Sequence, residues 1–166
     1  MSIARVAPVR AALPAGQVRI LHPGDVACAE HGDRLETLLG SCVAIVLTDP
    51  RRTVGAMCHI VHAGQAPPDA PKSTAYGGAA LDTMFSMLRA RSIDPRQCEA
   101  YVYGGGNMFP GQFQASHVGQ HNACWAFDEL GRSGVRVLCR DVGGSSYRRL
   151  SWTIGTAAPQ VTAVPV

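Results

Sequence analysis

The fold of this chain is decided by the stretch SCVAIVLTDPRRTVGAMCHIV, residues 41–61. Its first part, residues 41–48, is short, apolar and rich in branched side chains, which predicts a buried strand that ends at an Asp-Pro turn. Residues 54–61 have the same character, so the two segments predict an antiparallel hairpin. This hairpin would bring His59 back beside Cys42.

The segments that surround the hairpin alternate between helical and extended patterns. Apolar residues at helical spacing predict amphipathic helices over residues 74–91 and about 120–132. Three further apolar segments predict strands, at residues 98–103, 135–140 and 149–153. The proline-rich segment 64–74 predicts an exposed loop. Because tight hairpins argue against a purely parallel sheet, we expect an α+β fold with mixed sheets covered by helices.

The chain has the size and composition of one domain. Its 166 residues are 46% hydrophobic, which is enough to bury a substantial core. We expect a flexible arm at residues 1–17, a single folded domain at residues 18–156 and a flexible tail at residues 157–166. The opening residues are broken by prolines and do not resemble a signal peptide, and no apolar run is long enough to cross a bilayer. We therefore expect a cytoplasmic protein without membrane insertion.

The charged residues and cysteines exclude several classes of function. Lys and Arg number 15 against 12 Asp and Glu, and the basic residues are scattered, which argues against nucleic acid as a partner. The six cysteines are widely spread, so we expect free thiols, most of them filling the core. The Cys and His residues at 28–31 and 58–62 lack paired Cys-x-x-Cys spacing, which argues against a zinc site. No metal and no cofactor are predicted.

Cys42 is the candidate catalytic residue. It follows the run TLLGS, residues 37–41, which we interpret as a small-residue turn. A thiol after such a turn, with the imidazole of His59 on the next strand, is one way to build a cysteine hydrolase. The imidazole would favour the thiolate and later protonate the leaving group, while backbone N–H groups near Gly40 would face the oxyanion. The alternative is that Cys42 and His59 only fill the core.

A glycine run at residues 104–106 has two interpretations. It superficially resembles a phosphate cradle, but it lacks the lysine of a P-loop and the full dinucleotide fingerprint. A tight turn between strand and loop, where another backbone segment approaches closely, fits these residues better.

Several of these motifs occur together in one known family. They are LGSCV at 39–43, GAMCH at 55–59, GGGNMF at 104–109, GQHN at 119–122 and DVGG at 141–144 with Arg148. In this order they resemble the CheD family of chemoreceptor glutamine deamidases, over roughly residues 18–156. The resemblance implies a layered α/β/β fold similar to the catalytic domain of cytotoxic necrotizing factor toxins. It also implies hydrolysis of receptor glutamines to glutamate, with release of ammonia, through a cysteine thioester.

The resemblance also implies partners and a third site residue. The substrate would be the cytoplasmic helices of a methyl-accepting chemoreceptor, and a CheC-type phosphatase would be a regulatory partner. The family places a threonine shortly before the cysteine to orient the histidine, which points to Thr37. Some members have this threonine one position earlier, where this chain has Glu36, so Glu36 is a rival. The competing function is a non-catalytic adaptor that binds receptors or the phosphatase.

Overall fold

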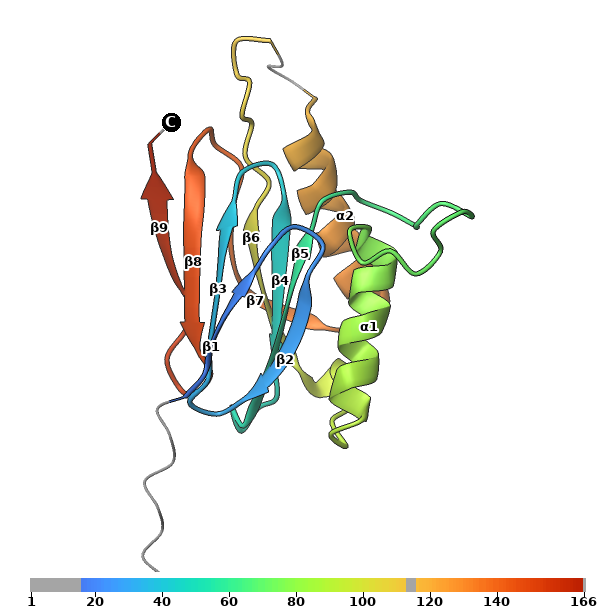
Figure 1. Cartoon of the computed structure of the whole chain (residues 1–166), viewed down its shortest axis with the longest axis vertical. Coiled ribbons are helices and arrows are strands. Elements are labelled where there is room, and N and C mark those ends of the chain that lie inside the picture. The colour runs from blue at the N-terminus through green and yellow to red at the C-terminus, as the bar shows by residue number, and fades with distance from the viewer. Residues whose placement is uncertain (1–15, 113–115, 166) are drawn as a thin grey trace, which may run out of the picture.

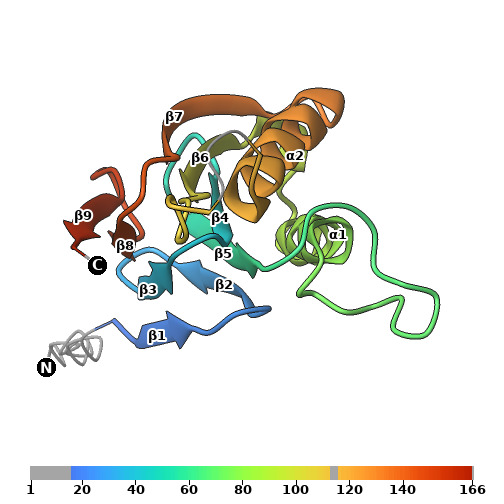
Figure 2. The ribbon, with the colours of Figure 1, turned by 90° about the horizontal axis from the view of Figure 1, so that it is seen from above.

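The protein is built from three layers, which the computed structural model describes for residues 16–112 and 116–165. We call the four-stranded sheet β1-β3-β8-β9 the outer sheet and the five-stranded sheet β2-β5-β4-β6-β7 the central sheet. The outer sheet packs against one face of the central sheet, and the helices α1 and α2 cover the opposite face (Figures 1 and 2). The order of layers is therefore helices, central sheet, outer sheet. The predicted α+β fold, with α/β/β layers, is confirmed.

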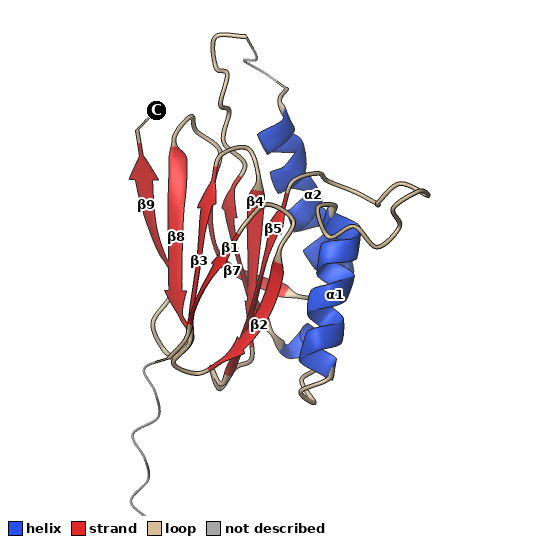
Figure 3. Cartoon of the chain, viewed as in Figure 1, coloured by secondary structure: helices blue, strands red, loops and turns tan. Residues whose placement is uncertain are grey.

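The elements have the following bounds. The outer sheet contains β1 (Val18–Leu21), β3 (Arg34–Leu39), β8 (Tyr147–Thr153) and β9 (Gln160–Val164). The central sheet contains β2 (Val26–Glu30), β4 (Val43–Thr48), β5 (Val54–Ile60), β6 (Glu99–Gly104) and β7 (Arg136–Val142). The helices are α1 (Gly77–Arg89) and α2 (Val118–Arg132), with a short 3-10 turn at Pro95–Gln97. Figure 3 shows the helices on one side of the strands.

The β4–β5 hairpin forms the middle of the central sheet, as predicted. β4 pairs antiparallel with β5 on one side and with β6 on the other. Val43 and Ile45 pack into the core under the helices, whereas Ala44 and Val46 pack into the core between the two sheets. Because both faces are covered, β4 is an unbroken apolar run, which explains why its pattern is so clear in the sequence.

The sheets are mixed and largely antiparallel, as expected. Within the part of the chain described, β1 pairs parallel with β3 and β6 pairs parallel with β7, and the other strand pairs are antiparallel. The parallel strands β6 and β7 are joined through α2, since a parallel pair needs a long crossover. α2 ends at Arg132 with Ser133 as its C-cap, and Gly134 follows with a φ of 71°, as is common just past a helix terminus.

Four strands were absent from the sequence interpretation: β1, β2, β3 and β9. The interpretation of residues 37–41 as a turn was wrong, because residues 37–39 form the end of β3 and the turn begins at Gly40. β1, β3 and β9 belong to the outer sheet, which exposes one face to solvent, and β2 is a five-residue strand at the edge of the central sheet. In β3 the residues are alternately buried and at least partly exposed, so an apolar run does not form.

Most of the expected N-terminal arm lies outside the described residues, whereas the expected C-terminal tail contains a strand. Of the arm at residues 1–17, residues 1–15 lie outside the described residues. Residues 160–164 form β9 on β8 instead of a flexible tail, with Val161 packed against the core between the sheets. Residues 64–74 form a loop of turns without helix or strand, as predicted, and it projects beside α1 in Figure 1. Neither of the helices in the described segments is long and apolar enough to span a membrane.

Candidate active site

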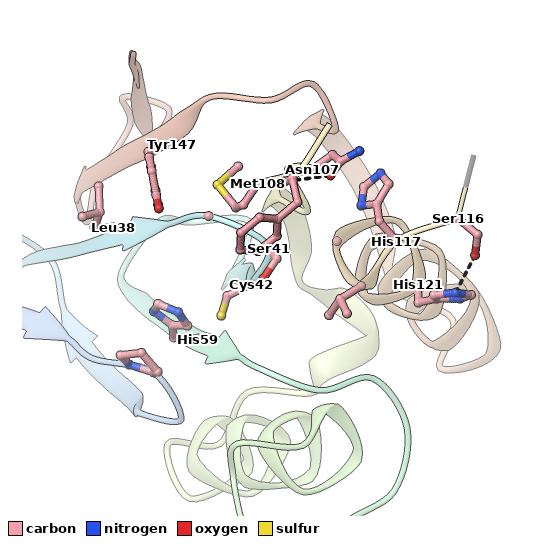
Figure 4. Close-up of a pocket in the computed structure, with 16 residues that line it drawn as sticks. Leu38, Ser41, Cys42, His59, Asn107, Met108, Ser116, His117, His121 and Tyr147 are labelled. Carbon is pink, nitrogen blue, oxygen red and sulfur yellow. Dashed lines mark hydrogen bonds between the residues drawn. The ribbon is translucent and has the colours of Figure 1, made fainter. Parts of the chain in front are cut away.

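A cavity of about 660 Å³ opens where the turn after β3, the end of β5 and the start of α2 meet. Its wall includes Gly40, Ser41 and Cys42 from the turn, and His59 from β5. The loop after β6 and the residues that begin α2 complete it (Figure 4). The predicted nucleophile and histidine therefore lie in one pocket.

Strand register places Cys42 and His59 on the same face of the central sheet. Ala44 of β4 is paired with His59 of β5, and Cys42 lies two residues before Ala44. Because alternate residues of a strand share a face, both side chains point toward the outer sheet. Figure 4 shows the sulfur of Cys42 directed toward the ring of His59. The predicted juxtaposition of these two residues is confirmed.

Thr37 of β3 reaches His59 from the outer sheet. Its Oγ1 lies 2.7 Å from Nδ1 of His59, and its hydroxyl donates to the carbonyl oxygen of Leu21 at 2.7 Å. A hydroxyl has one proton, so Thr37 accepts the second bond and His59 carries its proton on Nδ1. Nε2 of the neutral ring is then a free base. The contact with Thr37 thus fixes the tautomer in which Nε2 can accept the proton of a thiol.

Glu36 lies on the opposite face of β3. Thr37 is buried, whereas Glu36 is partly exposed and pairs with Arg34, with Nε and Oε1 3.0 Å apart. A shift of one residue along a strand reverses the side-chain direction. Of the two rivals for orienting His59, Thr37 is therefore the one bonded to the ring.

The loop between β1 and β2 forms two backbone hydrogen bonds with His59. The amide of His59 donates to the carbonyl oxygen of Asp25 at 3.0 Å, and Gly24 donates to the carbonyl oxygen of His59 at 2.9 Å. Burial lowers the pKa of His59 from 6.5 to about 4, and the nearby Asp25 only partly opposes this shift. Burial also raises the pKa of Cys42. The resting pair is therefore a neutral thiol and a neutral imidazole, which differs from the expected stabilisation of the thiolate.

The glycine run at the end of β6, residues 104–106, supports the turn that carries Cys42. Gly106 donates to the carbonyl oxygen of Gly40, and Gly105 donates to that of Cys42, each at 2.9 Å. A Cβ atom at Gly104, where φ is 107°, would collide with the carbonyl oxygen of Cys42. The glycines are needed because one backbone segment lies directly on the other, and the interpretation as a tight turn is confirmed.

Sequence reasoning missed Asn122. This α2 residue is 1% exposed, and its Nδ2 donates to the carbonyl oxygens of Ser41 at 3.1 Å and Val61 at 3.0 Å. It therefore connects the turn of Cys42 with the end of the strand of His59. The GQHN motif contains this residue, but no local pattern indicates which distant carbonyls it would meet.

The mouth of the pocket is apolar. Leu38, Phe109, Val118 and Tyr147 all line it and are large hydrophobic residues exposed to solvent, with Phe109 62% exposed. In Figure 4, Leu38 and Tyr147 lie on one side of the pocket. Apolar side chains gathered around a reactive group are typical of a surface that receives another molecule.

The remaining cysteines and histidines form no metal centre in the part of the chain that the structure describes. Within residues 16–112 and 116–165, no group of three or more His, Cys, Asp and Glu residues is arranged to hold a metal ion. The six cysteines are free thiols, as expected. The expectation that the others fill the core holds for Cys28, Cys58 and Cys98 but is wrong for Cys124 and Cys139, which are exposed.

Comparison with known proteins supplies the family. The family model described as CheD chemotactic sensory transduction matches residues 62–162. A probable chemoreceptor glutamine deamidase CheD 2 of Albidiferax ferrireducens is 35% identical over 138 residues, which cover 81% of this chain and 80% of that protein. The chain belongs to the CheD family. Cys42 and His59 precede the segment matched by the family model, so their roles are argued below from their geometry.

Other relatives are similarly distant. A probable chemoreceptor glutamine deamidase CheD of Methanococcus vannielii is 33% identical and covers 75% of this chain and 81% of its own length. One from Pseudomonas fluorescens is 31% identical, covering 81% and 78%. Among solved structures, a Neisseria meningitidis protein of the DUF152 family has a TM-score of 0.49 and 13% identity, covering 79% of this chain and 65% of that one. Each of the three CheD relatives covers three quarters or more of this chain.

Proposed function

We propose that this CheD protein is a chemoreceptor glutamine deamidase, with Cys42 as nucleophile, His59 as general base and acid, and Thr37 as the residue that orients His59. The observation that carries the proposal is the hydrogen bond between Thr37 and Nδ1 of His59, in a pocket where His59 faces Cys42 (Figure 4). The names of the relatives, probable chemoreceptor glutamine deamidases, support the same reaction.

The first half of the reaction forms a thioester. Nε2 of His59 takes the proton of the Cys42 thiol as the sulfur attacks the side-chain carbonyl carbon of a glutamine. The imidazolium that results is stabilised by Thr37, whose Oγ1 accepts a hydrogen bond from Nδ1–H. His59 then gives the proton from Nε2 to the leaving amide nitrogen, which departs as ammonia.

Backbone N–H groups of the turn would stabilise the oxyanion. The carbonyls of Gly40 and Ser41 are bonded to Gly106 and Asn122. In a planar trans peptide the next N–H points the opposite way, so the N–H groups of Ser41 and Cys42 point away from those partners. We assign these two donors to the oxyanion of the tetrahedral intermediate.

The second half of the reaction consumes water. His59, neutral again, accepts a proton from a water molecule that attacks the thioester carbonyl. Collapse of the second intermediate releases the carboxylic acid of glutamate, and the sulfur of Cys42 recovers its proton from His59. The burial that keeps His59 neutral at rest makes it available as a base in both halves.

The substrate in this proposal is the helical cytoplasmic region of a methyl-accepting chemoreceptor, which places the enzyme in the cytoplasm. The apolar mouth, with Phe109 and Val118 exposed, suits a protein surface around the target glutamine. Family membership also suggests a CheC-type phosphatase as a regulatory partner. No nucleic acid and no cofactor take part.

Mass spectrometry of a cognate receptor's cytoplasmic fragment tests the reaction. The parent protein should produce a gain of one mass unit at particular glutamines and release ammonia, and Cys42→Ala should do neither. Cys124→Ala, which removes an exposed thiol from α2, is the matched control and should behave as the parent. Binding of the fragment without deamidation would favour the adaptor function, and equal activity of Cys42→Ala and parent would refute the assignment of the nucleophile.

A further inference from the structure

We infer that Asn122 is a positioning residue that sets the spacing between Cys42 and His59. The inference rests on the proposed function and adds a residue of α2 to the machinery. Asn122 does not line the pocket, so it would act through the backbone that it holds.

The side chain of Asn122 has two donor protons on one nitrogen, and their two acceptors lie just before β4 and just after β5. Nδ2 lies 3.1 Å from the carbonyl oxygen of Ser41, directly before the nucleophile. It lies 3.0 Å from the carbonyl oxygen of Val61, just beyond β5. A single planar amide thus ties the start of β4 to the end of β5, where pairing of the two strands finishes at Val43 and Ile60.

The position of this bridge matters because the hairpin ladder does not extend to Cys42. The strand pairing ends at Val43, so the backbone of Cys42 needs other partners. Gly105 holds its carbonyl oxygen, and Asn122 holds the preceding carbonyl, that of Ser41. Because the Ser41–Cys42 peptide is planar, the bond from Asn122 also fixes the direction of the Cys42 N–H, one of the proposed oxyanion donors.

Burial makes the bridge rigid. Asn122 is 1% exposed, and it lies on the face of α2 that also carries Ala126 and Leu130 into the core under the helices. Loss of the amide protons would leave the carbonyl oxygens of Ser41 and Val61, both in partly buried residues, without the donor that the buried Asn122 supplies. The turn would then relax, and with it the approach of the sulfur to Nε2 of His59.

Asn122→Asp is the informative change, since it keeps the shape but removes the two donor protons. We expect kcat for receptor deamidation to fall by about tenfold or more, with KM within about twofold of the parent, because an oxyanion donor acts in the transition state and the mouth of the pocket is untouched. Leu130→Ala is the control on the same face of α2, and it should lower thermal stability while leaving kcat near the parent value.

Labelling of Cys42 tests the same inference without the receptor. The rate of alkylation of Cys42 by iodoacetamide, read by peptide mass spectrometry, is measured for the parent, Asn122→Asp, His59→Asn and the double variant. If Asn122 sets the spacing, the two substitutions should be coupled, so that His59→Asn slows labelling about tenfold less when Asn122→Asp is already present. Additive effects, or a kcat loss in Leu130→Ala equal to that in Asn122→Asp at equal loss of stability, would overturn the inference. An inactive parent that retains the coupling would refute the proposed function alone.

Discussion

Acid should destabilise this protein through His59. The folded-state pKa of His59 is about 4, against 6.5 for an ordinary histidine, because the ring is buried. Between these values the unfolded chain binds a proton that the folded chain does not. The contribution of His59 to the free energy of unfolding is therefore fully present above about pH 6.5 and is lost as the pH falls toward 4.

The size of the effect follows from the shift. Each pKa unit corresponds to about 1.4 kcal/mol, so the full contribution is about 3 kcal/mol, of which roughly 2 to 3 kcal/mol should disappear between about pH 7.5 and 4.5. This is a large part of the stability of a typical domain. Urea unfolding at both pH values, followed by the fluorescence of the buried Trp152, measures it.

The comparison that isolates His59 is with His59→Asn, which has no group that titrates in this range. Other carboxylates and histidines contribute equally to both proteins, so the parent should lose about 2 to 3 kcal/mol more than the variant on acidification. His31→Asn removes an exposed imidazole and controls for substitution of a histidine as such. Equal losses in parent and His59→Asn would refute the reasoning that burial keeps this ring neutral.

Three further perturbations have defined outcomes. Thr37→Val should leave the Nδ1 proton of His59 without its acceptor, costing about 1 to 3 kcal/mol of stability and about tenfold or more in kcat, whereas Thr37→Ser should stay near the parent in deamidation assays. Gly55→Ala should destabilise by about 1 to 3 kcal/mol in thermal unfolding, because its Cβ would collide with the ring of Trp152; unchanged stability would contradict the packing. Phe109→Ser should raise KM for a receptor fragment about three- to tenfold with little change in kcat, and an unaltered KM would remove the apolar mouth from substrate binding.

The sequence predicted the elements whose apolar residues are continuous or recur at a short, regular spacing. The apolar run at 43–48 and the helical spacing around 77–89 are visible because their burial is continuous or strictly periodic. Of the four strands of the outer sheet only β8 was predicted, and β1 and β9 were missed because they are short and largely exposed. A pattern diluted by solvent-facing residues predicts neither the strand nor its partners.

The candidate site divides in the same way. The sequence by itself determined the β4–β5 hairpin. It also determined the meeting of Cys42 and His59, since the second strand of a hairpin runs back alongside the first. Only the tertiary structure decided that Thr37 reaches His59, that Asn122 holds the turn of Cys42, and that burial keeps the imidazole neutral. These features depend on how the outer sheet and α2 pack against the hairpin, and such contacts join residues far apart in the chain, whose approach no local pattern encodes.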